Sequence, residues 1–150
     1  FIIVIGGIIF ARFLTYSGLV DVISEGLLGL GSGKYIYLLG FILLFLVLGC
    51  FIEPIAIMVM TLPIMYPVMV AQGFDPIWLG VVSVKLAEIG VLTPPVGLNV
   101  FVVKSSSPVP VTLGQVFIGV IPFIALDFLS LVLYVIFPEM ILWLPNLMKS

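Results

Sequence analysis

The residues best suited to do chemistry lie in one ten-residue stretch, 90–99, which reads GVLTPPVGLN. Its two adjacent prolines supply no backbone N–H, so we expect the carbonyl groups of residues 88–91 to lose their usual helical donors. Thr93 precedes a proline and is pushed towards an extended backbone. Gly97 can adopt dihedral angles closed to other residues, and Asn99 adds a side-chain carbonyl. The stretch therefore concentrates oxygen acceptors within an apolar sequence.

Two chemical outcomes are open for these oxygens. Unsatisfied backbone groups are costly in hydrocarbon, so irregular backbone persists there only where it is buried in protein or lines a site. A hard monovalent cation, Na⁺, would satisfy oxygens around Thr93, Pro94, Gly97 and Asn99. Mg²⁺ is not expected, because neutral carbonyl groups bind too weakly to replace its tightly held water molecules. The alternative is a structural proline kink, whose freed carbonyls are taken up by neighbouring helices, hydroxyl groups or water.

A second candidate set, Gly49, Cys50 and Glu53, lies between two apolar runs, residues 35–51 and 55–71. Each run is slightly shorter than the roughly 20 residues that a helix needs to cross a bilayer. The runs are either two short spans or the arms of one re-entrant helical hairpin. In the hairpin, the tip carbonyls and Glu53 could face the TPP break and join its cation site. In the spanning geometry, Glu53 is a solvated loop residue.

Three further charged residues lie within apolar segments. Lys85 and Glu88 are three residues apart on one predicted helix and could form a pair, which would neutralise both inside a helical bundle. Asp127 lies alone in a long apolar run. We expect it to make a hydrogen bond between packed helices, and a part in handling a proton or a substrate is the alternative.

The composition limits the possible functions. Of 150 residues, 63% are hydrophobic and 8% are charged, and the mean hydropathy is +1.47, which predicts an integral membrane protein. The net charge of −2 comes from singly scattered residues, so nucleic-acid binding is not expected. Histidine is absent and Cys50 is the only cysteine, which removes most catalytic and metal-binding sets. Asp127 has no second intramembrane aspartate in a comparable motif, so we expect a transporter or a structural membrane scaffold and not an enzyme.

These residues must be positioned by helices, and we predict one all-α membrane domain. Because the chain begins with Phe1 inside an apolar run, we interpret it as a piece of a longer polypeptide. The expected elements are a helix end (1–14), a helix along the membrane surface (15–34), the hairpin (35–72), a broken helix (77–103), a transmembrane helix (116–137) and a C-terminal tail (138–150) in which Trp143 is an interfacial anchor.

Three segments together resemble a known family. They read GCFIEPIAIMVMTLPIMYPVMVAQGFDPIWLGVV, then EIGVLTPPVGLNVFVVKSSS, and then VIPF followed by FPEMILWLP. In this order they are similar to the C-terminal half of the large membrane subunit of a tripartite ATP-independent periplasmic (TRAP) transporter. The resemblance implies an elevator-type ion-transporter fold with two inverted repeats, of which this chain is the second. Its re-entrant hairpin would enter from the periplasmic side and meet the TPPVG break across a Na⁺ and substrate site.

The function implied by the resemblance is sodium-coupled import of a small organic acid, such as a dicarboxylate, sialic acid or a similar carboxylate. Na⁺ is the expected coupling ion, and Pro54, Pro95 and Val96 are the expected substrate-binding residues. The implied partners are a small membrane subunit, either separate or fused, a periplasmic substrate-binding protein, the N-terminal half of the same chain and membrane lipid. The implied location is the bacterial inner membrane, which the chain would cross several times.

Overall fold

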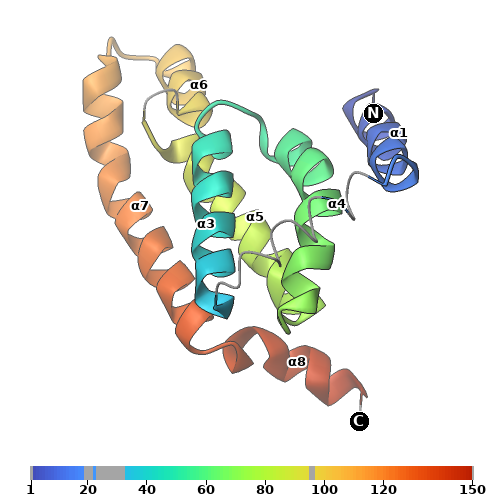
Figure 1. Cartoon of the computed structure of the whole chain (residues 1–150). Coiled ribbons are helices and arrows are strands. Elements are labelled where there is room, and N and C mark those ends of the chain that lie inside the picture. Colours follow the sequence, from blue (N-terminus) through green and yellow to red (C-terminus); the bar gives the residue numbers. More distant parts are fainter. Residues whose placement is uncertain (1, 19–21, 23–32, 95–96, 150) are drawn as a thin grey trace.

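The described part of the chain is built from helices alone. The computed structural model describes residues 2–18, 22, 33–94 and 97–149, and these contain no strand (Figure 1). Most of the surface helix expected at 15–34 lies outside the described residues. The helices are α1 (Ile2–Tyr16), α3 (Lys34–Gly49), α4 (Pro54–Ala71), α5 (Pro76–Leu92), α6 (Leu98–Ser106), α7 (Leu113–Ile136) and α8 (Glu139–Lys149). The expected all-α architecture is confirmed for this part.

The predicted hairpin is formed by α3 and α4, which run antiparallel and are joined by residues 50–53. At 1.5 Å per residue the two arms are about 24 Å and 27 Å long, a little less than the hydrocarbon core of about 30 Å. Glu53 ends the turn as the N-cap of α4, where its side chain accepts a hydrogen bond from the Ala56 N–H at 3.1 Å. Pro54 follows at the first helical position, where a proline needs no N–H partner.

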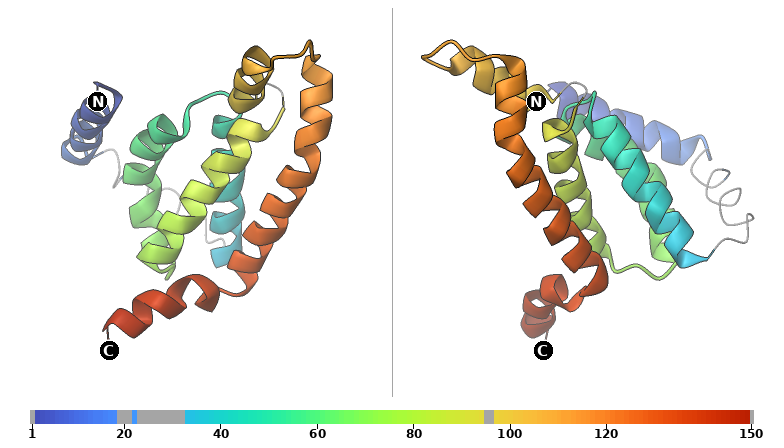
Figure 2. Two further views of the ribbon diagram at one scale, coloured as in Figure 1. Left: turned by 180° about the vertical axis from the view of Figure 1, so that it is seen from behind. Right: turned by 90° about the vertical axis from the view of Figure 1, so that its left-hand side faces the viewer.

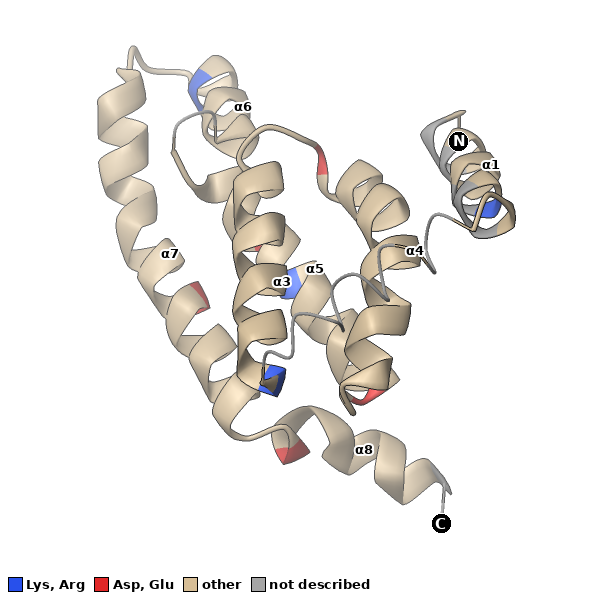
Figure 3. Cartoon of the chain, in the orientation of Figure 1, with Lys and Arg blue, Asp and Glu red and all other residues tan. Residues whose placement is uncertain are grey.

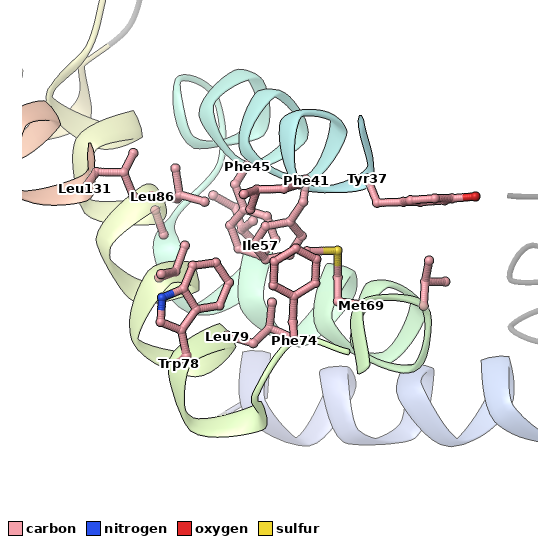
Figure 4. Close-up of a cluster of buried hydrophobic side chains, with 14 of the residues drawn as sticks. Tyr37, Phe41, Phe45, Ile57, Met69, Phe74, Trp78, Leu79, Leu86 and Leu131 are labelled. Atoms are coloured by element: carbon pink, nitrogen blue, oxygen red, sulfur yellow. The ribbon is translucent and has the colours of Figure 1, made fainter. Parts of the chain in front are cut away.

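Helix α5 is the centre of the bundle and packs against α3, α4 and α7. Its start is fixed by Asp75, whose carboxylate accepts from the N–H groups of Ile77 and Trp78 at 2.8 Å and 3.2 Å. The core that surrounds α5 is apolar and aromatic (Figure 4). Its fully buried large side chains include Phe41, Phe45, Ile57, Met69, Leu79 and Leu86. Burial of these side chains holds both arms of the hairpin against the broken helix.

Helix α7 is the longest helix and begins three residues before the predicted span. Thr112 and Gln115 form a reciprocal capping box at its start, which places the first helical residue at Leu113. Among the described residues, α4 and α7 are long and apolar enough to cross a membrane. Leu131 is the one buried side chain of α7, so most of this apolar helix is open to its surroundings, as a lipid-facing helix would be.

The predicted C-terminal tail is a helix. Helix α8 turns away from the end of α7 and runs across the base of the bundle (Figure 2). Its exposed apolar side chains include Met140, Trp143, Leu144 and Leu147. An apolar face that contains a tryptophan suits a helix lying in the membrane interface, so the structure extends the sequence prediction for Trp143 to the whole segment.

Candidate functional site

The TPPVG break has the local geometry that its residues predict. Helix α5 ends at Leu92, and Thr93 is extended, with φ −83° and ψ 137°. Gly97 adopts the left-handed conformation, with φ 58° and ψ 64°, and starts α6. A Cβ atom on Gly97 would lie 2.9 Å from a ring carbon of Phe117 in α7. The position therefore needs glycine for its dihedral angles, and a larger residue would also have to displace the end of the Phe117 ring.

Two of the predicted substrate-binding residues, Pro95 and Val96, lie outside the described residues. Pro54, the third, is half-buried at the first position of α4.

The prediction that the carbonyl groups of residues 88–91 lose their partners needs correction. The Thr93 hydroxyl donates to the Ile89 carbonyl at 2.6 Å, and the Thr93 N–H donates to the Gly90 carbonyl at 3.0 Å. Val91 is the first residue of this stretch for which both positions that could donate to its carbonyl from the next turn, 94 and 95, are prolines without an N–H. Since Thr93 uses its hydroxyl hydrogen in this bond, the oxygen lone pairs remain available as acceptors.

The hairpin tip lies against the break, although the two are more than 40 residues apart in the sequence. Gly49 of α3 and Gly90 of α5 touch through their backbones, because a Cβ on Gly90 would lie 2.5 Å from the Cα of Gly49. Beside this contact, the Cys50 thiol donates to the Pro94 carbonyl at 3.6 Å. Four of the predicted cation-site residues thus lie close together: Gly49, Cys50, Pro94 and Thr93, which directly precedes Pro94 in the chain.

Glu53 and Asn99 are less closely joined to this cluster. The Glu53 side chain is exposed, and one of its carboxylate oxygens caps α4. Asn99 is exposed in the first turn of α6. Within the described chain, no hydrogen bond links either side chain to Thr93, Pro94 or Gly97.

The tip and the break each present the start of a helix. The start of α4 is capped by the Glu53 carboxylate, which also offsets the positive end of that helix dipole. The start of α6 follows Gly97 and has no side-chain cap. The Val100 N–H donates to the Gly97 carbonyl at 2.8 Å, so the N–H groups of Leu98 and Asn99 are the better place for an anionic group from outside.

An ion pair across two helices was missed by the sequence analysis. Lys85 and Glu88 do pair as predicted, with Nζ 3.5 Å from Oε2. The closer partner of Lys85 is Asp127 of α7, whose Oδ1 is 2.5 Å from the same Nζ. The expected hydrogen bond of Asp127 between packed helices is confirmed, and its partner is the lysine. The signal available in the sequence for this ion pair was one residue of each charge, Lys85 and Asp127, in two different apolar segments.

The hairpin and the break together are typical of one class of membrane protein. A helical hairpin whose tip meets an unwound segment of a second helix, next to a long apolar helix, is the architecture of a membrane protein with a discontinuous helix.

Comparison with known proteins identifies the family. Residues 1–140 match the family described as the tripartite ATP-independent periplasmic transporter, DctM component, and the chain belongs to this family. The chain is 35% identical over 148 residues to the C4-dicarboxylate TRAP transporter large permease protein DctM of Vibrio cholerae, an alignment that covers 99% of this chain and 32% of the relative. It is 34% identical over 144 residues to the DctM protein of Pseudomonas aeruginosa, which covers 96% and 33%.

A relative with a different named substrate aligns with a similar identity over a similar length. The sialic acid TRAP transporter large permease protein SiaM of Vibrio cholerae is 33% identical over 147 residues, which covers 97% of this chain and 34% of SiaM. The chain thus spans about a third of the length of these relatives. The relatives are transport permeases, so the chain is a membrane protein of a transporter family and not of a family of enzymes.

Proposed function

We propose that this chain is the second inverted repeat of a sodium-coupled importer of a small organic acid, which works by an elevator mechanism in the bacterial inner membrane. One observation carries the proposal: the hairpin tip touches the break through the Gly49–Gly90 contact and the hydrogen bond from Cys50 to Pro94. A tip and an unwound helix that meet in this way bring backbone oxygens from two segments to one place. In secondary transporters such oxygens coordinate the coupling cation.

The proposed Na⁺ ligands are oxygens of the residues around this contact. They come from Thr93, Pro94, Gly97 and Asn99 at the break and from Gly49, Cys50 and Glu53 at the tip. Cys50 would contribute its carbonyl, because its thiol is a donor to Pro94 and sulfur is a poor ligand for a hard cation. The Pro94 carbonyl has a second lone pair beside the one that accepts the thiol.

The proposed substrate is an acid because the start of α6 can receive a carboxylate. That helix start has no side-chain cap, so its N–H groups and its positive dipole end favour an anion. Pro54, Pro95 and Val96 would flank the substrate from the two sides of the site. The named substrates of the two DctM relatives and of SiaM, C4-dicarboxylate and sialic acid, carry carboxylates, which supports this class for the present chain.

The proposed partners follow from the family and from the covered length. The chain spans about a third of its relatives, so we expect the N-terminal half of the same protein to supply the first repeat and the other side of the site. A small membrane subunit, separate or fused, and a periplasmic substrate-binding protein would complete the transporter. In a multi-pass arrangement, α7 would face lipid.

The test is sodium-dependent uptake by the complete transporter, reconstituted in vesicles with its small subunit and its binding protein. We expect Thr93→Ala and Asn99→Ala to raise the sodium concentration for half-maximal uptake and to leave assembly intact. Ser105→Ala is the matched control, since its hydroxyl also donates to a helix carbonyl, that of Val102 at 2.9 Å, but lies in the last turn of α6. An unchanged sodium dependence in both site variants would refute the cation site.

A structural membrane scaffold is the second candidate. It is favoured by the two hydrogen bonds from Thr93 to Ile89 and Gly90, which satisfy carbonyls as an ordinary proline kink would. A scaffold predicts that Pro94→Ala and Pro95→Ala leave function intact, whereas a transport site predicts loss of uptake. Uptake measured in vesicles for both variants separates the two candidates.

A further inference from the structure

The ion pair between Lys85 and Asp127 lies apart from the proposed site and has no part in it so far. The Lys85 and Asp127 side chains are 20% and 22% exposed, and Glu88, the weaker partner, is 58% exposed. Figure 3 shows that most charged residues lie at helix ends or turns, whereas α5 and α7 carry charge along their middle. This pair is therefore a charged contact between the middle parts of two largely apolar helices.

Its depth makes the pair unusual. At 1.5 Å per residue, Asp127 is about 21 Å along α7 from Leu113 and about 14 Å from Ile136. Both distances place it well inside the hydrocarbon core when α7 crosses the membrane. Charged groups at such a depth are costly, pair with one another and mark function. An apolar contact between the two helices would have held them together without that cost.

The pair also occupies a particular place along the α5–α7 contact. At one end, the Trp78 Nε1–H donates to the Tyr134 carbonyl at 2.7 Å. Near the start of α7, Phe117 lies beside Gly97, which is the N-cap of α6 and not a residue of α5. The pair lies between these two contacts, and Thr93 follows Lys85 by about 12 Å along the helix. Helix α7 packs against both α5 and α6, so a slip of α7 along α5 by one turn, about 5.4 Å, would carry α6 with it and change the geometry of the break.

We propose that Lys85 and Asp127 are positioning residues that fix the height and rotation of α7 against α5. Because α7 also packs against α6, the pair thereby holds the two sides of the break, α5 and α6, in the geometry that binds the coupling cation. Apolar side chains pack without direction, whereas a charge on each of two helices favours the register in which the two charges meet. The inference rests on the proposed function and adds two residues to it that do not touch the cation.

The test uses the complete transporter in vesicles and a double variant, K85M/D127L, which removes both charges and leaves neither unpaired. We expect normal amounts of this variant in the membrane, and a sodium concentration for half-maximal uptake raised by at least about tenfold, because a shift of about 1 Å at a functional site is enough to cost that much. We expect uptake at saturating sodium to stay close to the wild-type rate. The alkylation rate of the Cys50 thiol should rise, because the thiol loses its contact with Pro94.

The charge-swapped variant K85D/D127K restores the pair and should recover most of the sodium affinity. Lys34→Met is the matched control, because Lys34 is tied to the Gly73 carbonyl at 3.2 Å, at the far end of α3; it should leave the sodium dependence unchanged. A normal sodium dependence in K85M/D127L would overturn the inference. Loss of both pair variants from the membrane would also overturn it, because the pair would then act in folding alone. Sodium-independent uptake by the wild type would overturn the proposed function, and this inference with it.

Discussion

The contact between Gly49 and Gly90 gives the sharpest prediction. A Cβ on Gly90 would lie 2.5 Å from the Gly49 Cα and 2.9 Å from its carbonyl carbon, both of which are backbone atoms. Neither atom can turn aside as the end of a flexible side chain could. Carbon atoms pack at about 3.5 Å or more, so Gly90→Ala must push the tip away from α5 by about 1 Å.

The size of the effect follows from this displacement. Overpacking of a close contact destabilises by about 1–3 kcal/mol. If that free energy is lost from cation binding, the sodium concentration for half-maximal uptake rises by roughly 5- to 150-fold, at tenfold for each 1.4 kcal/mol. The displacement should also free the Cys50 thiol from Pro94 and expose it to alkylation.

The assay compares Gly90→Ala with Gly80→Ala in the complete transporter. Gly80 lies in the same helix, and a Cβ there would meet no heavy atom within 4 Å. The control substitution should be neutral or stabilising by about 0.5–1 kcal/mol, because alanine favours a helix over glycine. Sodium titrations of uptake and alkylation of Cys50, with other cysteines of the full protein removed, are measured for both. If the two variants gave the same sodium dependence and the same labelling rate, the reasoning would be refuted.

Two further predictions concern the ends of the helices at the site. Gly97→Ala should lower uptake at least about tenfold and lower the free energy of unfolding by about 1–3 kcal/mol. The reason is that residue 97 has a positive φ and that the added Cβ would press on the Phe117 ring. Uptake equal to that of the wild type would show that the left-handed turn is dispensable. Glu53→Ala should lower stability by about 1 kcal/mol through loss of the α4 cap, as thermal unfolding in detergent would measure. Glu53→Asn keeps a capping oxygen without the charge, so it should keep the stability and weaken sodium affinity; unchanged sodium affinity would remove Glu53 from the cation site.

The local features of the fold were predictable because each depends on residues close in sequence. The break follows from two prolines and a glycine, whose effects on dihedral angles and hydrogen bonds are local. The hairpin turn follows from Glu53 and Pro54 between two apolar runs. The start of α7 was placed three residues late, although Thr112 and Gln115 have the spacing of a capping box, because they lie in a segment that reads as a polar loop.

The contacts between distant segments were not predictable from this sequence. Nothing in the sequence pairs Gly49 with Gly90, since each helix contains another glycine, Gly40 in α3 and Gly80 in α5, and only packing selects Gly49 and Gly90. The same holds for Lys85, whose nearest acid in sequence is Glu88 but whose closest partner in space is Asp127. The sequence left open whether oxygens around Thr93 bind a cation or a hydroxyl group takes up a freed carbonyl, and the bond from the Thr93 hydroxyl to Ile89 appears only once the end of α5 is built.

Oxygens from the hairpin tip and from the break are proposed to hold one sodium ion, and a density map of the complete transporter in sodium would show whether they do. We expect a compact density between Gly49–Cys50 and Thr93–Gly97, with oxygen atoms of both segments at coordination distance. This density should disappear when sodium is replaced by choline. An ion bound elsewhere, or the same density in choline, would contradict the proposal.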